Sequence, residues 1–280
     1  MKKKFKEFLK RKALRLLILQ YYRKQPLDKI TDEIREVLEY LKHRPVNVFP
    51  YTFKDKYKVA EMDVKLDTEL NLFYVMFEGK RMYYKDGQNK LKAKKYFRAV
   101  ISEQDPRSPH RYLVDDFNVE KDEIVVDIGA AEGIFGLMII DKVSKLYLFE
   151  PDNNWHKALH ATFKPWENKI EIVPKMVSDL DSQDSTSLDR YFANRKGPDF
   201  IKIDVDGIEE KVIMGSRKIF NEKKKPKVAI CTYHFQEDAE AFSKFFKNAG
   251  FSTCFSRGYM IYRVAIKKPY LRRGVLRAWR

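Results

Sequence analysis

The feature that most constrains the fold is an apolar strand that runs into a turn of small residues and then into a helical segment. It covers residues 125–133 and reads VVDIGAAEG. Only small residues let a ligand approach the backbone N–H groups closely at such a bend. The segment therefore predicts an α/β domain in which a cofactor lies against Gly129, Ala130, Ala131, Glu132 and Gly133.

The chemistry of this turn favours one class of cofactor. The spacing of Gly129, Ala131 and Gly133 differs from the G-x-G-x-x-G pattern that suits a dinucleotide pyrophosphate. Asp127, which comes just before the turn, would repel a phosphate but would suit a cationic amino-acid ligand. We therefore expect S-adenosylmethionine as the cofactor, bound in part by Asp127, with NAD as the alternative.

Around the turn, short apolar strands alternate with helical periods, which is typical of βαβ units and a parallel sheet. We expect strands at residues 124–129, 145–150, 170–177, 200–205 and 227–233, and helices at residues 133–141, 153–163, 209–221 and 237–250. Residues 251–257 and 260–266 are strand-like runs joined at Gly258, too close together for a crossover helix, so they predict an antiparallel hairpin. The predicted fold is a Rossmann-like class I methyltransferase domain, with a mostly parallel sheet that ends in this hairpin.

The chain divides into four predicted segments. They are a basic helical segment (1–45), a small strand-rich appendage with a lid (46–118), the S-adenosylmethionine-binding domain (119–268) and a basic tail (269–280). The first segment holds two helices separated near Pro26, the second capped by Asp28 or Thr31.

Residues that follow the second and third strands are candidate cofactor ligands. Glu150 ends the second strand, where a carboxylate can accept hydrogen bonds from both ribose hydroxyls, and Pro151 and Asp152 follow it. Val177 and Ser178 follow the third strand and would lie beside the adenine, although Ser-Asp is also common in ordinary turns. Glu150 supports an adenosine ligand without choosing between the two cofactors, because NAD enzymes also place an acid here.

The next two strand ends carry the candidate catalytic groups. Asp204 ends an apolar strand, so its carboxylate is expected to face the methyl donor. His234 ends the following strand, and an imidazole can accept the proton of an alcohol nucleophile near neutral pH. Either His234 or Asp204 is therefore the expected base. Asp206 and Glu209 come after Asp204, where they either face the reaction or cap the next helix.

These segments resemble the FkbM-type methyltransferases. The resemblance is carried by VVDIGAAEGIFGL, LYLFEPD, PKMVSD, STSLDRYF, PDFIKIDVDGIEEKVIMGS and AICTYHFQED, within residues 124–240. It implies O-methylation of a sugar, a polysaccharide unit or a related small acceptor, with S-adenosylmethionine as donor. The upstream SEQDPRSPHRYL looks like the lead-in of a bacterial subset, which implies a lid that carries Glu103, Ser108, His110 and Tyr112.

The resemblance has one departure. Asp206 stands where the family more often has Glu, and the shorter carboxylate argues against a metal contact that needs the longer side chain. Clustered carboxylates would permit Mg²⁺, but the sequence does not require it. No metal is therefore predicted.

The formal charge of +16 is concentrated at the two chain ends. Residues 1–24 hold ten Lys or Arg and one Glu, and residues 267–280 hold six Lys or Arg and no acid. An enzyme that tracks nucleic acid would be expected to place basic residues around its active site, so nucleic acid is a disfavoured partner. In the first helix one side carries Phe5, Phe8, Leu9, Leu16 and Leu19, which fits equally an anionic membrane surface or the protein's own body.

The sequence also predicts a cytoplasmic protein, peripheral at the inner membrane face if the first helix binds lipid. No apolar run approaches the roughly 18 residues of a membrane span. Cys231 and Cys254 lie in apolar runs and are expected to be buried thiols of a reducing compartment.

Three competing classes remain. The first is an NAD-dependent nucleotide-sugar oxidoreductase or epimerase, which the glycine spacing and the hairpin disfavour. A nucleic-acid methyltransferase is the second, which the basic chain ends alone support. The third is a membrane-recruited scaffold with a decayed cofactor domain, which the intact turn at residues 129–133 opposes.

Overall fold

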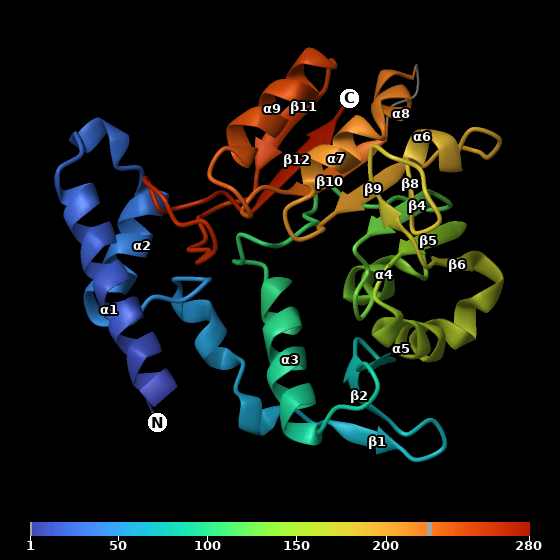
Figure 1. The fold of residues 1–280 in the computed structure, drawn as a ribbon, viewed down its shortest axis with the longest axis horizontal. Coiled ribbons are helices and arrows are strands. Elements are labelled where there is room, and N and C mark those ends of the chain that lie inside the picture. Colours follow the sequence, from blue (N-terminus) through green and yellow to red (C-terminus); the bar gives the residue numbers. More distant parts are fainter. Residues whose placement is uncertain (1, 223–225) are drawn as a thin grey trace.

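The computed structural model describes residues 2–222 and 226–280, with side chains from residue 6 onward. Its centre is a seven-stranded sheet in the order β11-β12-β10-β9-β4-β5-β6 (Figure 1). The strands are β4 Ile124–Ile128, β5 Lys145–Phe149, β6 Ile170–Val173, β9 Phe200–Ile203, β10 Lys227–Cys231, β11 Ser252–Phe255 and β12 Val275–Trp279. β12 is antiparallel to both of its neighbours, and the strands from β10 to β6 are parallel. The predicted α/β methyltransferase-type fold is therefore confirmed.

Helices cover both faces of this sheet, because successive side chains of a strand point to opposite faces. Val125 and Leu146 belong to the core shared with α4 Ile134–Ile139 and α5 Asn153–Phe163. Val126 and Ile201 belong to the core on the opposite face. The helices of that face are α6 Leu188–Tyr191, α7 Glu209–Met214, α8 Arg217–Asn221 and α9 Asp238–Asn248.

The N-terminal region begins with two packed helices, α1 Lys2–Arg23 and α2 Asp32–His43. The Thr31 side chain accepts a hydrogen bond from the Ile34 amide and caps α2, as predicted. A side chain of α1, Arg15, donates to two carbonyls at the end of α2, those of Leu41 and Lys42. Figure 1 shows this helical pair apart from the sheet, beside the segment that leads to β12.

A small antiparallel sheet and one helix connect these parts. Its strands are β1 Lys65–Asp67, β2 Leu72–Phe77 and β3 Lys80–Tyr83, and the helix is α3 Lys90–Glu103. Short 3₁₀ turns lie at Leu27–Lys29, Thr52–Lys56, Val59–Glu61 and Lys164–Lys169, and a two-stranded sheet joins β7 Met176–Val177 to β8 Ser185–Thr186. The N-terminal elements share a continuous apolar core with the α4 side of the large sheet, so the described parts pack as one body.

The C-terminal prediction is wrong in one respect. The antiparallel pair exists, but β11 pairs with β12 at residues 275–279 and not with residues 260–266. Residues 275–279 of the expected basic tail are therefore a strand of the large sheet. The cation of this strand, Arg277, is buried because backbone carbonyls satisfy it: Arg277 donates to the carbonyls of Tyr112 and Arg111.

Two smaller expectations also differ. The expected strand at residues 170–177 is divided between β6 and β7, and the expected helix at residues 209–221 is divided between α7 and α8. Cys231 is buried as expected, whereas Cys254 is exposed because it lies on the edge strand β11.

Among the described residues, no helix has both the length and the apolar character that crossing a membrane requires.

Candidate cofactor and acceptor site

A cavity of about 400 Å³ opens at the carboxyl ends of β4, β5 and β9. β4 lies between β5 and β9 in the sheet, so the chain leaves β4 at the point where the strand order reverses, which is where open parallel sheets bind ligands. The volume is within the range of about 300–1,000 Å³ found for small-molecule sites. The side of the cavity away from the sheet is formed by residues of α3, among them Tyr96, Val100 and Glu103.

The turn after β4 lies tightly between its two neighbouring strands. The Gly129 amide donates to the Phe149 carbonyl on β5 at 2.9 Å. A Cβ atom on Gly129 would lie 2.0 Å from the Asp204 carbonyl oxygen, and the residue has φ +77°, so only glycine fits. Gly133 does not line the cavity, and a Cβ there would instead meet Phe163 at 2.6 Å. The turn therefore forms the cradle through Gly129, Ala130 and Ala131.

Glu150 lies beside this cradle, at the end of β5. One carboxylate oxygen accepts a hydrogen bond from the Ala131 amide and the other from the Asp152 amide, each at 2.8 Å. The side chain is thus fixed against the turn and lines the cavity. A carboxylate oxygen can accept more than one hydrogen bond, so Glu150 keeps the capacity to bind two ribose hydroxyls.

Asp127 is buried and faces a lysine that the sequence analysis did not identify. Lys202 Nζ on β9 lies 2.9 Å from Asp127 Oδ1 and donates to the Gly129 carbonyl at 2.6 Å. Burial raises the pKa of Asp127, and the neighbouring Lys202 ammonium partly offsets this shift. Burial opposes the charge of Lys202, but the carboxylates of Asp127 and Asp204 raise its pKa above the usual range. The expectation that Asp127 offers a free negative charge to the cofactor needs correction, because Lys202 already balances it.

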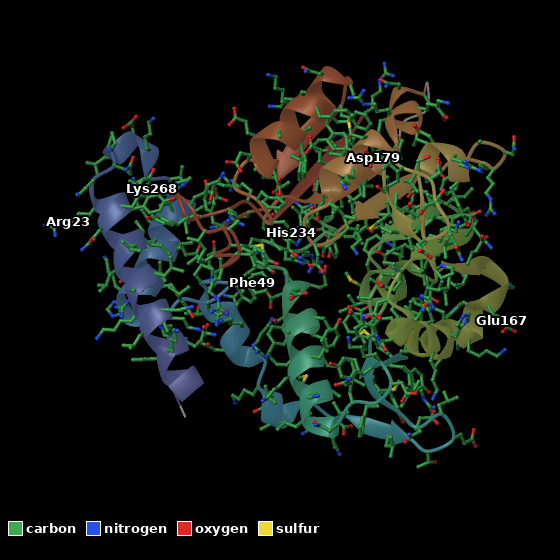
Figure 2. The ribbon with its side chains drawn as sticks, in the orientation of Figure 1. Arg23, Phe49, Glu167, Asp179, His234 and Lys268 are labelled. Carbon is green, nitrogen blue, oxygen red and sulfur yellow. The ribbon has the colours of Figure 1, made fainter. Side chains whose placement is uncertain are left out.

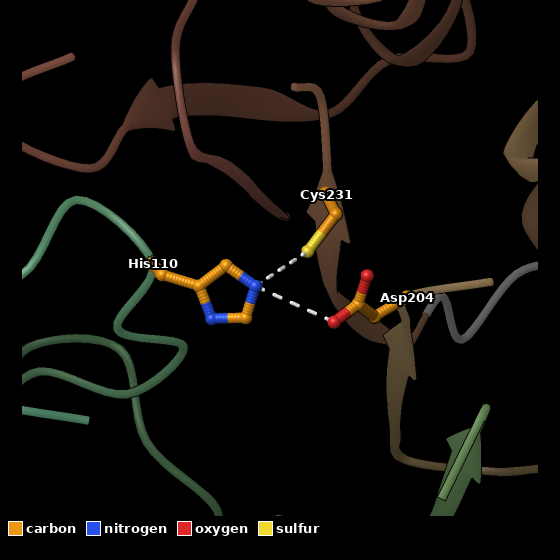
Figure 3. Close-up of side chains that lie close together, drawn as sticks. All are labelled: His110, Asp204 and Cys231. Carbon is orange, nitrogen blue, oxygen red and sulfur yellow. Dashed lines mark hydrogen bonds and ion pairs between the residues drawn. The ribbon is translucent and has the colours of Figure 1, made fainter. Parts of the chain in front are cut away.

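Asp204 carries the most hydrogen bonds at the acceptor side of the cavity. Its oxygens accept hydrogen bonds from the hydroxyls of Tyr112 at 2.8 Å and Tyr233 at 3.2 Å. Figure 3 shows His110 Nε2 directed at this carboxylate, 3.4 Å away, and at Cys231 Sγ, 3.7 Å away. Burial alone would raise the pKa of Asp204, but the His110 ring and Lys202 hold it well below its usual range. Asp204 is therefore an ionised acceptor of hydrogen bonds.

His234 lies deeper than the cavity wall, near the middle of the molecule in Figure 2. Its Nδ1 is 2.8 Å from Glu209 Oε1 and its Nε2 is 3.6 Å from Asp206 Oδ1. Burial opposes protonation of the ring, but the Asp206 and Glu209 carboxylates raise the pKa of His234 to about 10. Glu209 also accepts a hydrogen bond from the Val205 amide.

The lid side of the cavity holds a second buried carboxylate, Glu132. Tyr96 of α3 donates a short hydrogen bond to it, and Tyr96 packs against Trp155 of α5 with ring centroids 5.3 Å apart. Burial raises the pKa of Glu132 to about 7, although the Tyr96 hydrogen bond lowers it. Burial likewise raises the pKa of Glu103. α3 is therefore joined to the cofactor turn by the hydrogen bond from Tyr96 to Glu132, and to α5 by the contact of Tyr96 with Trp155.

With this geometry described, comparison with known proteins identifies the family. The family model of the methyltransferase FkbM domain matches residues 103–253, more than half of the chain. The chain belongs to the FkbM methyltransferase family. It is thus an S-adenosylmethionine-dependent methyltransferase, and the NAD-dependent alternative is not favoured.

Similar solved structures include a methyltransferase FkbM from Methylobacillus flagellatus, with 18% identity and a TM-score of 0.47. The match covers 69% of this chain but only 56% of that one. A magnesium protoporphyrin IX methyltransferase from Synechocystis, described with bound SAM, has 18% identity and a TM-score of 0.44 over 70% of this chain and 88% of its own. No curated protein matches the chain.

The cavity of this FkbM methyltransferase fits its cofactor. The Gly129 cradle would admit no side chain, and the Glu150 carboxylate lies beside it. The predicted site residues that line the cavity are Glu103, Tyr112, Asp127, Gly129, Ala130, Ala131, Glu132, Glu150, Pro151, Asp152, Val177, Asp204 and Asp206. Those that do not are Ser108, His110, Gly133, Ser178, Glu209 and His234. His110, which does not line the cavity, and Tyr112, which does, both contact Asp204.

The sequence analysis missed Lys202, Tyr96, Val100, Trp155 and Tyr233 as cavity residues. A signal existed for Lys202, because a lysine in the middle of a buried parallel strand needs a buried partner. No comparable signal existed for Tyr96 or Trp155, since only the packing of α3 and α5 brings them to the cofactor turn.

Proposed function

We propose that this FkbM methyltransferase methylates a hydroxyl group of a sugar, a polysaccharide unit or a related small acceptor. The observation that carries the proposal is the Asp204 carboxylate at the cavity wall, with the Tyr112 and Tyr233 hydroxyls bonded to it. These groups offer several hydrogen-bond partners to an acceptor, grouped around the two oxygens of the ionised Asp204 carboxylate. An acceptor alcohol suits this polar wall, and the family resemblance implies the same class of acceptor.

The residues divide between holding the cofactor and handling the acceptor. The backbone of Gly129 and Ala131 and the Glu150 carboxylate would hold S-adenosylmethionine, which supplies an electrophilic methyl group. Asp204 accepts the hydrogen bond of the acceptor hydroxyl and orients its oxygen toward the methyl group. Asp204 is better placed than His234 to contact the acceptor, because Asp204 lines the cavity and His234 does not.

Two measurements test this proposal. Calorimetric titration with S-adenosylhomocysteine and with NAD, in parallel, should show binding of the first alone. Release of S-adenosylhomocysteine is then followed with a panel of free sugars, nucleotide sugars and oligosaccharides. Asp204→Asn should lower turnover by about 10²-fold, the size of effect expected when the acceptor oxygen is no longer oriented.

The matched control is Glu171→Gln, a carboxylate on β6 outside the cavity that bonds Tyr191 and Arg195. It should keep its activity. Binding of NAD without S-adenosylhomocysteine contradicts the cofactor assignment, and undiminished turnover of Asp204→Asn contradicts the role of Asp204.

We also infer that α1 contacts an anionic membrane surface. The helix has two faces: Leu14, Ile18 and Tyr22 are buried against the body, whereas the opposite side is open. The large apolar side chains of the open side, each about half exposed, are Phe8, Leu9, Leu16 and Leu17, and exposed Lys6, Lys10, Lys12 and Arg23 accompany them. Basic residues near anionic headgroups contribute about 1 kcal/mol each, in addition to the burial of the apolar side chains.

Removal of α1 would be a poor test, because it would expose the core under Ile18. The double variant Leu9→Ser/Leu16→Ser changes only the open side. We expect the unmodified protein to sediment with phosphatidylglycerol vesicles and not with phosphatidylcholine vesicles, and the variant to stay in solution. Leu66→Ser, an exposed apolar site on β1, is the control. Equal sedimentation of the two proteins would exclude the membrane role.

A further inference from the structure

His234 is buried in an environment that does not satisfy its ring by hydrogen bonding. The side chain is 3% exposed, yet neither ring nitrogen makes a hydrogen bond of good geometry to any residue that the structure describes. A buried polar group without a hydrogen-bond partner costs about 1–3 kcal/mol. Such a group in a folded protein calls for an explanation, such as a bound ion.

Carboxylates surround this ring. Glu209 Oε1 is 2.8 Å from Nδ1 but lies off the direction in which a ring N–H would point. Asp206 Oδ1 is 3.6 Å from Nε2, and ligand atoms of Asp204, Glu209 and His234 all lie within 4.8 Å of one another. Among the described side chains, those of residues 6–222 and 226–280, no lysine or arginine forms an ion pair with Asp204, Asp206 or Glu209.

We infer that Asp204, Glu209 and His234 form a binding site for a divalent transition-metal ion. Two ligand atoms bound to one metal through bonds of about 2.1 Å are about 3.0–3.4 Å apart. Their lone pairs point at the metal, so neither atom lies along the lone-pair direction of the other. The pair Glu209 Oε1 and His234 Nδ1 has this relation within a few tenths of an ångström. Carboxylate oxygens with one imidazole suit Mn²⁺ or Zn²⁺ better than an all-oxygen ion such as Ca²⁺.

Asp206 completes the arrangement as an outer partner. A histidine bound to a metal through one nitrogen usually donates its other N–H to a carboxylate, and Nε2 faces Asp206. The Asp206 side chain is 98% exposed and therefore leaves room on that side for solvent. The shorter Asp at this position is compatible with an outer role, although the sequence alone argued against a metal contact.

The neighbouring group of His110, Asp204 and Cys231 is a weaker candidate. Its atoms are also close together, but the ring nitrogen of His110 that faces the group has polar partners within the protein. His110 Nε2 already has Tyr233 Oη at 3.4 Å and Cys231 Sγ at 3.7 Å. These polar contacts need no ion.

Asp204 joins the metal site to the cavity. One oxygen can bind the ion while the other accepts the acceptor hydroxyl, and a nearby cation lowers the pKa of that hydroxyl. This role for the ion rests on the proposed function. The binding of the ion does not, because Glu209 and His234 lie outside the cavity wall.

The test uses the full-length protein, stripped with a chelator, without cofactor or acceptor. Titration with Mn²⁺, followed by electron paramagnetic resonance and calorimetry, should show one tightly bound ion per chain, and Zn²⁺ should compete for it. Glu209→Gln and His234→Gln should weaken Mn²⁺ binding at least tenfold. Glu103→Gln, which changes a half-buried acid at the cavity but outside the group, should bind Mn²⁺ as the unmodified protein does.

Glu209→Gln keeps the oxygen that accepts from the Val205 amide, so this variant is expected to fold even if the histidine variant does not. Failure of the unmodified protein to bind either ion overturns the inference, as does undiminished binding by Glu209→Gln. Methyl transfer that persists in the chelated protein overturns the role of the ion and leaves the proposed function intact. Ion binding without methyl transfer to any acceptor contradicts the proposed function and leaves the metal site intact.

Discussion

At the carboxyl edge of the large sheet, charged side chains are buried together with apolar ones, whereas the α1–α2 pair buries apolar side chains and leaves its charges at the surface. Asp127 and Lys202 are almost fully buried and paired with each other. In the helical pair, Ile18, Val37 and Leu41 are fully buried, and ion pairs such as that of Lys42 and Glu39 are exposed.

The difference shows where this fold accepts an energetic cost. Burying a charge costs several kcal/mol unless a partner compensates it, and a pair of buried charges rarely stabilises a fold more than apolar packing would. The sheet edge therefore holds its charges for binding and chemistry, and the helical pair contributes stability. Substitutions in the two regions should separate these effects.

The largest effect is expected at Gly129. Gly129→Ala places a Cβ atom 2.0 Å from the Asp204 carbonyl oxygen, so β4 and β9 must move apart at the cofactor cradle. We expect S-adenosylhomocysteine binding to fall by more than a hundredfold, measured by calorimetry, together with a loss of stability.

Gly79→Ala is the matched control, because Gly79 has nearly the same φ, +78° against +77°, but open space around it. It should show only the cost of the left-handed conformation, about 1–2 kcal/mol. Similar behaviour of the two variants would mean that the close approach at Gly129 is not what the site requires.

A smaller effect, of a different kind, is expected in the helical pair. Leu41→Ala removes a fully buried side chain of α2 and should lower the free energy of unfolding by about 2–5 kcal/mol. The affinity for S-adenosylhomocysteine should stay unchanged, because Leu41 does not line the cavity. Leu27→Ala, at an exposed site, should change neither quantity. A parallel loss of affinity in Leu41→Ala would show that the helical pair also shapes the cavity.

The same comparison explains how much of the molecule the sequence could predict. The expected helix at residues 153–163 matches α5, and four of the five expected strands match to within two residues, because local period and apolar runs specify these elements. Asp204 and Glu150 could be placed at one edge because parallel strands end together.

What the sequence could not predict depends on contacts between distant segments. β12 contains Arg277, whose burial is acceptable only because the distant backbone carbonyls of Arg111 and Tyr112 accept its hydrogen bonds. The amino-acid composition of β12 therefore resembles that of a solvated tail. The Tyr96 contact to Glu132 depends in the same way on how α3 packs, which no local pattern encodes.

The third prediction concerns Glu132, the buried carboxylate at the sheet edge to which Tyr96 of α3 donates a hydrogen bond. Its pKa is raised from 4.5 to about 7, so the folded protein binds this proton more tightly than the unfolded chain does. The stabilisation is fully present below about pH 4.5 and is lost as the pH rises through about 7. Glu132→Gln removes this dependence. Relative to the unmodified protein, it should therefore gain about 2 kcal/mol in the free energy of unfolding between pH 5 and pH 8.

Tyr96→Phe provides the opposite change at the same contact. The Tyr96 hydrogen bond lowers the pKa of Glu132 against the effect of burial, so its removal should raise that pKa further and extend the loss of stability to higher pH. Denaturant unfolding of the three proteins from pH 5 to pH 8.5 measures both variants. Opposite shifts would show that Glu132 controls how firmly α3 closes the cavity. Parallel curves for all three proteins would mean that the Glu132 carboxylate is solvated in solution. The contact between Tyr96 and Glu132 would then contribute no pH-dependent stability.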